Sequence, residues 1–397
     1  MTNPIALAVK LRIGAEKIVK QGHPWIFSDS IEKINKVGKA GDVAVLFDQR
    51  NNKVFGIGLY DPDSPIRIKM IHLGGSAKID EMFFKEKIFE AFQIRKALLE
   101  TDTNAYRLIF GENDSLPGLI FDVYNKVGVV KLYSPIWLPY LKMIVPAIAE
   151  ISNVESLVLR LSRNLQKMNI PFKEGDVLFG DFKNSIVTFK EYGVQFQADV
   201  LLGHKTGFFL DHRANRYKVG QISKNKTVLD VFSYAGGFSV HALSGGAKEV
   251  TSLDFSKQAL ELAKQNAQLN EHSGQHLILD GDAFVLLKEL VTKKKQYDIV
   301  IIDPPSFAKS KKEIDVAKKK YAELTTLGIQ LTRKKGILIL ASCSSRISAN
   351  EFLEVHQEEF ERLGVPFELE EFTQHDIDHP VAFDEGAYLK TGYYRIT

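Results

Sequence analysis

From about residue 225 to residue 302, the chain alternates between apolar segments of strand length and segments with helical spacing. We expect strands at residues 227–231, 249–253, 276–279 and 298–302, and helices that begin near Phe238, Ser256 and Ala283. This alternation is typical of a mostly parallel sheet with covering helices. Ligands of such sheets bind just beyond the carboxyl ends of the strands. The pattern therefore predicts an α/β domain with a ligand site at those strand ends.

The preceding residues have two other patterns. Short alternating segments separated by turn residues lie at 41–48, 54–60 and 66–71, which predicts a small β-barrel. Gly74-Gly75-Ser76 resembles a linker, and it is followed by a helical segment and then by strands expected at 106–110, 119–124 and 127–132. We therefore predict three domains: the β-barrel over residues 1–73, a central α+β domain over 74–190 and the α/β domain over 191–397.

The composition is that of an ordinary soluble protein, with 45% hydrophobic and 25% charged residues. A single cysteine excludes an internal disulfide and favours a reducing, cytoplasmic location. No apolar run reaches the roughly 20 residues that a membrane-spanning helix needs, so we expect no membrane association. The net charge of +3 permits nucleic-acid binding through local basic patches but does not require it.

Small and acidic residues follow the expected strands of the α/β region. The first strand runs into a turn with Tyr234 and Gly236, which lacks the Gly-x-Gly-x-x-Gly pattern of a dinucleotide site. Asp254 ends the second strand, where a carboxylate can accept hydrogen bonds from ribose hydroxyls, and Asp282 follows the third, where it could meet an adenine amino group. Any doubly wound sheet has Gly and Asp in such loops, but three acidic loops followed by Asp303-Pro304-Pro305 form a stronger signal.

Cys343 is the only cysteine, and it follows a strand expected at residues 336–340. A lone thiol near the acidic, proline-rich loop at Asp303 suggests a covalent nucleophile. The alternative is a small buried hydrophobic residue, which is the usual role of a free cysteine. Position alone does not decide between the two.

These strings together resemble a known family. Residues 230–238, Asp254, residues 281–284 and residues 303–307 are similar to the successive motifs of class I S-adenosylmethionine-dependent methyltransferases, which are Rossmann-like. With residues 203–213 and 22–27, the match covers nearly the whole chain. It resembles the bacterial and archaeal enzymes that make 5-methylcytidine in large-subunit ribosomal RNA, which have an N-terminal PUA domain, a central α+β domain and a C-terminal methyltransferase domain.

The resemblance implies roles for individual residues. Cys343 occupies the place of the catalytic cysteine, and Asp303 could stabilise the activated cytosine ring. The implied S-adenosylmethionine pocket comprises Phe208, Phe232, Tyr234, Gly236, Asp254, Asp282 and Asp303. The implied substrate-binding residues are Lys205, Arg213, Pro304, Lys309 and Lys311, and no metal is expected. Many RNA cytosine-5 methyltransferases have a second cysteine after the Asp-Pro-Pro motif; Ser306 stands there, so product release must take another route.

Two other functions fit part of the sequence. The loop at residues 303–307 also resembles the Asp/Asn-Pro-Pro-aromatic loop of enzymes that methylate exocyclic amines, for which Cys343 would serve only in packing. A non-catalytic RNA-binding protein on a methyltransferase scaffold is the other alternative. The intact acidic loops and the placement of the thiol favour the cytosine-5 reaction.

Large-subunit ribosomal RNA is the expected partner, and a homodimer is suggested by the resemblance alone. Basic residues of the predicted barrel would bind phosphates; these are Lys10, Arg12, Lys17, Lys20, Arg67 and Lys69. We expect Trp25 and Phe27 to fill the small core of the barrel rather than to stack on bases. The sequence does not identify the modified nucleotide or the base that removes the carbon 5 proton.

Overall fold

A computed structural model describes residues 3–308 and 310–397. The chain divides into two compact units. The first runs through Lys190 and also takes in Ala198–Leu210 and Ile377–Gly386, and the second comprises Glu191–Gln197, Asp211–Asp376 and Ala387–Thr397. The predicted division into three domains stays a prediction. None of the helices in the described ranges has the length and apolar character to cross a membrane.

The predicted barrel is a curled sheet with the strand order β2-β6-β5-β4-β1-β3. Its strands are β1 (Ala6–Leu11), β2 (Trp25–Phe27), β3 (Ile31–Ile34), β4 (Val43–Phe47), β5 (Val54–Tyr60) and β6 (Ile66–Leu73), and helix α1 (Ile13–Lys20) follows β1. Alternate residues such as Ala44 and Leu46 of β4 point into a small core. The alternating sequence pattern therefore corresponds to a sheet with one buried face.

Two expectations for this sheet are wrong. Phe27 is 43% exposed, and Trp25 lies outside the small core, where its indole N–H donates to Glu112 Oε1 over 3.0 Å. Both belong to the short edge strand β2, in which only Ile26 between them is buried, because successive side chains point to opposite faces. Lys69 does not face solvent as a phosphate contact would; it is buried in an ion pair with Asp61 at 2.7 Å.

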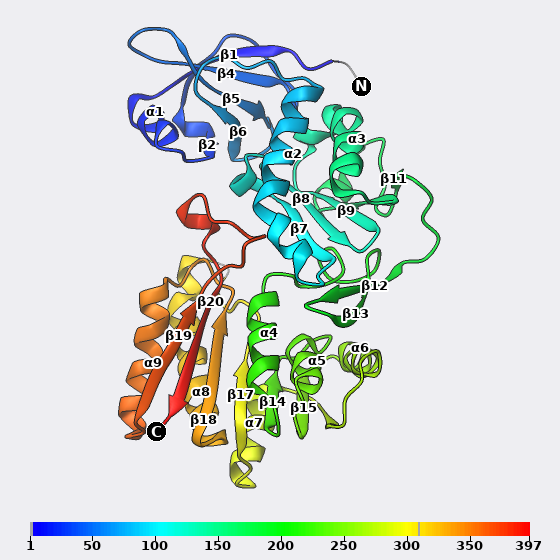
Figure 1. Ribbon diagram of the computed structural model, residues 1–397. Coiled ribbons are helices and arrows are strands. Elements are labelled where there is room, and N and C mark those ends of the chain that lie inside the picture. Colours follow the sequence, from blue (N-terminus) through cyan, green and yellow to red (C-terminus); the bar gives the residue numbers. More distant parts are fainter. Residues whose placement is uncertain (1–2, 309) are drawn as a thin grey trace. The chain divides into compact units, whose positions relative to one another are not determined.

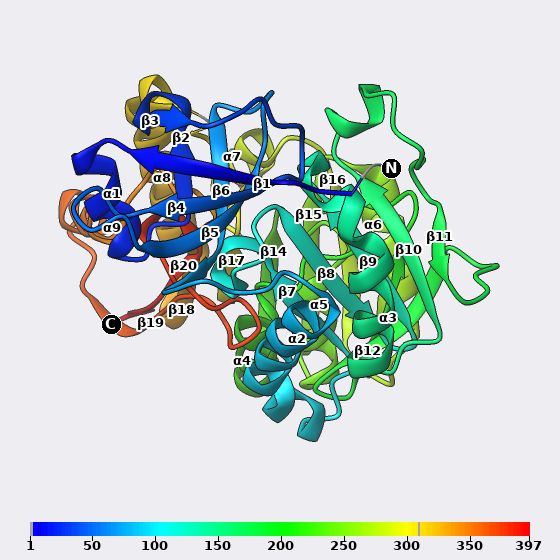
Figure 2. The ribbon, with the colours of Figure 1, turned by 90° about the horizontal axis from the view of Figure 1, so that it is seen from above.

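The central segment forms a second sheet in the same unit, with the order β11-β10-β9-β8-β7. Its elements are α2 (Glu81–Arg95), β7 (Ala105–Phe110), β8 (Leu119–Tyr124), β9 (Val127–Leu132), α3 (Leu141–Ser152), β10 (Ser156–Leu161) and β11 (Val177–Phe179). Helices α2 and α3 lie side by side (Figures 1 and 2). Ile57, Leu59 and Ile71 of the first sheet share a core with this layer, so the two sheets of the unit are packed together.

A hairpin of β12 (Ile186–Glu191) and β13 (Val194–Asp199) leads into the second unit, which has a seven-stranded sheet of order β16-β15-β14-β17-β18-β20-β19. Its strands are β14 (Thr227–Val231), β15 (Glu249–Asp254), β16 (Gln275–Asp280), β17 (Tyr297–Ile302), β18 (Thr332–Ser342), β19 (Phe367–Thr373) and β20 (Lys390–Ile396). Its helices are α4 (Arg213–Ile222), α5 (Gly237–Ser244), α6 (Lys257–Gln268), α7 (Ala283–Thr292), α8 (Ile314–Leu331) and α9 (Ala349–Leu363).

The first five strands of this sheet are parallel, and β20 runs antiparallel to both β18 and β19. The alternation predicted for residues 225–302 is therefore confirmed. The chain reverses the direction of strand addition at β14, which lies between β15 and β17 (Figure 1). Such a reversal opens a crevice beyond the carboxyl ends of the strands, and this is where α/β sheets bind their ligands.

Candidate active site

The loop after β14 has an unusual backbone. Phe232, Tyr234 and Gly236 have positive φ angles of 65°, 46° and 76°. Left-handed conformations are costly for residues other than glycine, so the surrounding structure must hold them. The N–H of Tyr234 donates to Asp254 Oδ2 at 2.9 Å, and a Cβ on Gly236 would lie 2.8 Å from the Cβ of Ala263. The loop is thus tightly fixed between β15 and α6.

Two buried polar atoms near this loop have no hydrogen-bond partner among the described residues. Asp230 Oδ2 accepts from the N–H and the hydroxyl of Ser239, but Asp230 Oδ1 and the Ser233 hydroxyl remain unpaired. Burial, helped by the nearby charges of Asp303 and Asp254, raises the pKa of Asp230 to about 7, although the hydrogen bonds from Ser239 lower it. Buried polar groups are normally paired, so both atoms fit a site that is completed by a polar ligand.

Further acidic residues lie at the neighbouring strand ends. Asp254 is 7% exposed, and its Oδ1 accepts from the Ser256 N–H at 2.9 Å. Asp282 is exposed and caps α7 by accepting from the Val285 N–H at 3.1 Å. Phe255, which the sequence interpretation did not name, is 78% exposed beside Asp254. The acidic loops thus gather at one end of the sheet, as predicted.

The same end of the sheet brings Asp303, Pro304 and Cys343 together. Parallel pairing aligns Ile302 of β17 with Leu340 of β18, so the residues that follow both strands emerge side by side. The half-buried Cys343 Sγ lies 3.9 Å from the carbonyl oxygen of Pro304. The Asp303 side chain keeps 25% of its surface exposed. A carboxylate and a thiol therefore flank one accessible loop.

His212 lies behind this carboxylate. Its Nε2 is 3.4 Å from Asp303 Oδ1, and its Nδ1 is 3.1 Å from Asn215 Nδ2. The Asn215 oxygen accepts from the hydroxyls of Thr373 and Tyr393, which fixes the orientation of the amide. Because the amide nitrogen is a donor, Nδ1 must accept, and a neutral imidazole carries its proton on Nε2, facing Asp303.

Lys390 lies beside the loop that contains Cys343. It is 4% exposed, and its Nζ donates to the carbonyl oxygens of Ser344 at 2.6 Å and Ile347 at 2.7 Å. Burial lowers the pKa of Lys390 to about 8, against the opposing effects of Cys343 and Glu351. Sequence reasoning gave no role to Lys390 or His212, because their partners are far away in the chain.

The remaining predicted residues belong to other segments of the chain. Phe208 is buried against Phe189 in the first unit, with ring centroids 5.2 Å apart. Lys205 is exposed in the same unit, and its carbonyl accepts from Lys131 Nζ. In the second unit Arg213 is fully buried and donates to Asp376 at 3.0 Å, and Lys311 is exposed. Lys309 lies outside the described residues. The roles of all these residues stay predictions.

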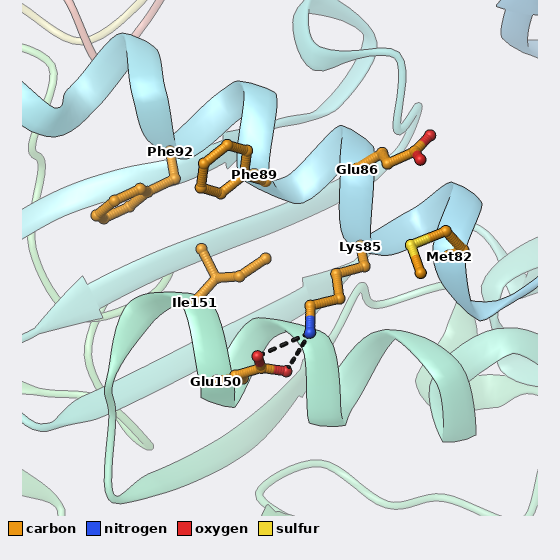
Figure 3. Close-up of a pocket in the computed structure, with 7 residues that line it drawn as sticks. All are labelled: Met82, Lys85, Glu86, Phe89, Phe92, Glu150 and Ile151. Atoms are coloured by element: carbon orange, nitrogen blue, oxygen red, sulfur yellow. Dashed lines mark hydrogen bonds and ion pairs between the residues drawn. The ribbon is translucent and has the colours of Figure 1, made fainter.

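A hollow of about 350 Å³ in the first unit lies between α2 and α3 (Figure 3). Its lining comprises Met82, Lys85, Glu86, Phe89, Phe92, Glu150 and Ile151. A Lys85–Glu150 ion pair of 2.7 Å crosses it. The lining contains none of the predicted site residues.

Comparisons with known proteins identify the family. A family model described as an S-adenosylmethionine-dependent methyltransferase matches residues 162–390, which is more than half of the chain. The chain belongs to this methyltransferase family. A model of a PUA-like domain matches residues 9–72 of the methyltransferase. The predicted family and fold class, including the PUA-like N-terminal domain, are thereby confirmed.

Curated relatives match the methyltransferase over its whole length. The Deinococcus radiodurans protein named ribosomal RNA large subunit methyltransferase is 38% identical over 408 residues, with 100% of both chains covered. The ribosomal RNA large subunit methyltransferase I of Aliivibrio fischeri is 33% identical and covers 97% of this chain and 98% of its own. The solved structure of SMU.776, a candidate methyltransferase in complex with SAH, has a TM-score of 0.83 at 24% identity, with 99% and 100% coverage, and supports the fold.

The cofactor of the methyltransferase is S-adenosylmethionine. The residues at the end of β14 fit it, because Asp230 Oδ1 and the Ser233 hydroxyl offer two buried unpaired polar atoms at the strand ends where such a ligand binds. Its ammonium and ribose hydroxyls are donors of the kind that a carboxylate accepts.

Proposed function

We propose that the methyltransferase transfers a methyl group to carbon 5 of a cytidine in large-subunit ribosomal RNA through a covalent adduct with Cys343. The observation that carries the proposal is the placement of the sole thiol beside the Asp303-Pro304 loop, 3.9 Å from the Pro304 carbonyl oxygen. The ribosomal RNA substrate is supported by the names of the relatives in Deinococcus and Aliivibrio. A PUA-like domain is compatible with an RNA substrate.

A thiol is needed because carbon 5 of cytosine is a poor nucleophile. The Cys343 thiolate adds to carbon 6, and the displaced electron pair makes carbon 5 nucleophilic. The bound cofactor would supply the electrophilic methyl group of its sulfonium to carbon 5 and would leave as S-adenosylhomocysteine. Loss of the carbon 5 proton then returns an electron pair to the ring, the carbon 5–carbon 6 double bond re-forms, and the Cys343 sulfur leaves as thiolate. The thiolate that adds to carbon 6 is thus released again at the end of the reaction.

Asp303 is proposed to bind the cytosine ring opposite the thiol. Its Oδ1 faces His212, so Oδ2 is the oxygen left to contact the ring nitrogen or the amino group. A hydrogen bond there would stabilise the charge that the ring carries once the thiolate has added to carbon 6. The target base must leave its stack to reach this position, at a cost of a few kcal/mol.

Mechanism-based trapping tests the proposal. RNA that contains 5-fluorocytidine at the modified position has no carbon 5 proton to lose, so elimination is blocked and a covalent complex accumulates. We expect an adduct stable to denaturing electrophoresis with the native chain plus S-adenosylmethionine, and none with Cys343→Ala. Omission of the cofactor serves as a second control.

The opposite result has a defined meaning. A Cys343→Ala variant that still methylates RNA would remove the nucleophile assignment and favour the exocyclic-amine reaction at the Asp303-Pro304-Pro305 loop. Failure to bind S-adenosylhomocysteine would instead favour the non-catalytic RNA-binding protein. Cytoplasmic action and a homodimeric assembly stay predictions.

A further inference from the structure

We propose that Lys390 activates Cys343: its buried ammonium holds the loop after β18 in place and stabilises the thiolate. This inference rests on the proposed function, in which Cys343 is the nucleophile. It concerns a residue of the return strand β20, nearly fifty positions further along the chain.

Strand register delivers Lys390 to this loop. In the antiparallel β18–β20 pair, Lys390 is aligned with Ser342, the residue that precedes Cys343. Residues aligned across two strands place their side chains on the same face. Lys390 is the first residue of β20, and Ser342 is the last of β18, so the lysine lies where β18 gives way to the loop.

The ammonium of Lys390 binds that loop through two hydrogen bonds. Its two hydrogen bonds, to the carbonyl oxygens of Ser344 and Ile347, bracket the turn that follows Cys343. A protonated lysine has three N–H donors, so these two bonds leave one for a further acceptor. The carbonyl of Ser344, the residue next to Cys343, is only 2.6 Å from Nζ, and the charge of Lys390 interacts with Cys343.

Among the described residues, Lys390 is a buried source of positive potential that interacts with Cys343. Tyr321 of α8 also interacts with Cys343, but burial raises its pKa so far that it stays neutral. Asp303 contributes a negative charge, which opposes a thiolate. Glu351 of α9 attracts Lys390 but is itself paired with Lys318 at 2.7 Å. The positive charge of Lys390 therefore offsets the unfavourable effect of the Asp303 charge on the Cys343 thiolate.

Lys390 has the charge that is needed to stabilise the Cys343 thiolate at neutral pH. With a pKa of about 8, the ammonium is mostly protonated at neutral pH. A cation beside a cysteine lowers the thiol pKa below its ordinary value of about 8.5. Only the thiolate adds to carbon 6, so the fraction of active enzyme near pH 7 depends on this pair.

The single cysteine permits a direct test. The rate of Cys343 alkylation by iodoacetamide, followed by mass spectrometry across pH, reports the thiol pKa of the full chain without RNA. We expect a pKa below about 8 for the native chain, a rise of one unit or more in Lys390→Met, and a value near native in Lys390→Arg. Lys334→Met is the matched control, since it removes an exposed lysine from β18, the strand that leads to Cys343, and should leave the thiol pKa unchanged.

Two results would overturn the proposal: a native thiol pKa at or above about 8.5, or a folded Lys390→Met variant with the native thiol pKa. If Lys390→Met does not fold, the thiol pKa values of the native chain and of Lys390→Arg still test the proposal. If the role of Lys390 were purely structural, Lys390→Met would lower the melting temperature without changing the thiol pKa of Cys343. Fluorocytidine trapping is measured separately: no trapping by a native chain with a low thiol pKa would contradict the proposed function, and the effect of Lys390 on the thiol pKa would still be decided by the alkylation rates.

Discussion

At the residue scale, Asn215 determines which nitrogen of His212 carries the proton. Its amide donates to Nδ1, so the neutral imidazole presents an Nε2–H to Asp303. The distance of 3.4 Å is long for a hydrogen bond, and catalytic contacts of this kind often tighten when the substrate binds. His212 is therefore a positioning residue for Asp303 rather than a group that touches the substrate.

This arrangement predicts different effects for two substitutions of His212. His212→Leu removes the donor and should lower kcat by about tenfold or more, the worth of a hydrogen bond to a charged group. His212→Gln keeps a donor and should retain more of the activity. Methyl transfer from labelled S-adenosylmethionine to RNA measures kcat, and titration with S-adenosylhomocysteine should give nearly native affinity for both variants. Full activity of His212→Leu would contradict the positioning role.

At the scale of elements, the loop between β14 and α5 is specified by a glycine that has no room for a side chain. Gly236 has a φ of 76°, and its Cβ would lie 2.8 Å from Ala263 on α6. Gly364, which ends α9, has a φ of 62° but open space around the position of its Cβ. The two positions share the left-handed backbone conformation and differ in the space around the Cβ.

The comparison predicts the outcome of two alanine substitutions. Gly364→Ala should cost about 1–2 kcal/mol, the price of a left-handed alanine. Gly236→Ala should cost at least about 1 kcal/mol more, because α6 or the loop must move. It should also weaken S-adenosylhomocysteine binding, while Gly364→Ala should not. Urea unfolding and ligand titration measure both; equal stability losses with native affinity in both variants would refute the steric argument.

Local pattern predicted the strands and loops of the site but not the contacts between them. The apolar runs before Asp303 and Cys343 correctly located two parallel strands, and parallel pairing then brings their ends together. Lys390 could not be placed in this way, since its position depends on an antiparallel strand that returns after α9 and β19. Phe27 was misjudged because an aromatic residue of an edge strand can face either the core or solvent.

At the scale of the whole molecule, the two compact units have separate cores. One core joins β5 and β6 to the central sheet, and another lies on one face of the seven-stranded sheet, under helices α7, α8 and α9. The boundary does not follow the order of the chain, because Ala198–Leu210 and Ile377–Gly386 belong to the first unit although they flank or interrupt the second. Sequence pattern alone could not show this, since both segments are short and lack regular periodicity.

Separate cores predict that a cofactor analogue stabilises the units unequally. The atoms that fit the cofactor, Asp230 Oδ1 and the Ser233 hydroxyl, belong to the second unit. A ligand at one hundred times its Kd adds about 2.7 kcal/mol to the state that binds it. In calorimetry, S-adenosylhomocysteine should therefore raise the unfolding transition of the second unit by several degrees and leave that of the first nearly unchanged. Cys343→Ala should show the same shift, because the thiol is assigned to the RNA base rather than to the cofactor. A single transition that moves as a whole would mean that the two units unfold as one cooperative body in spite of their separate cores.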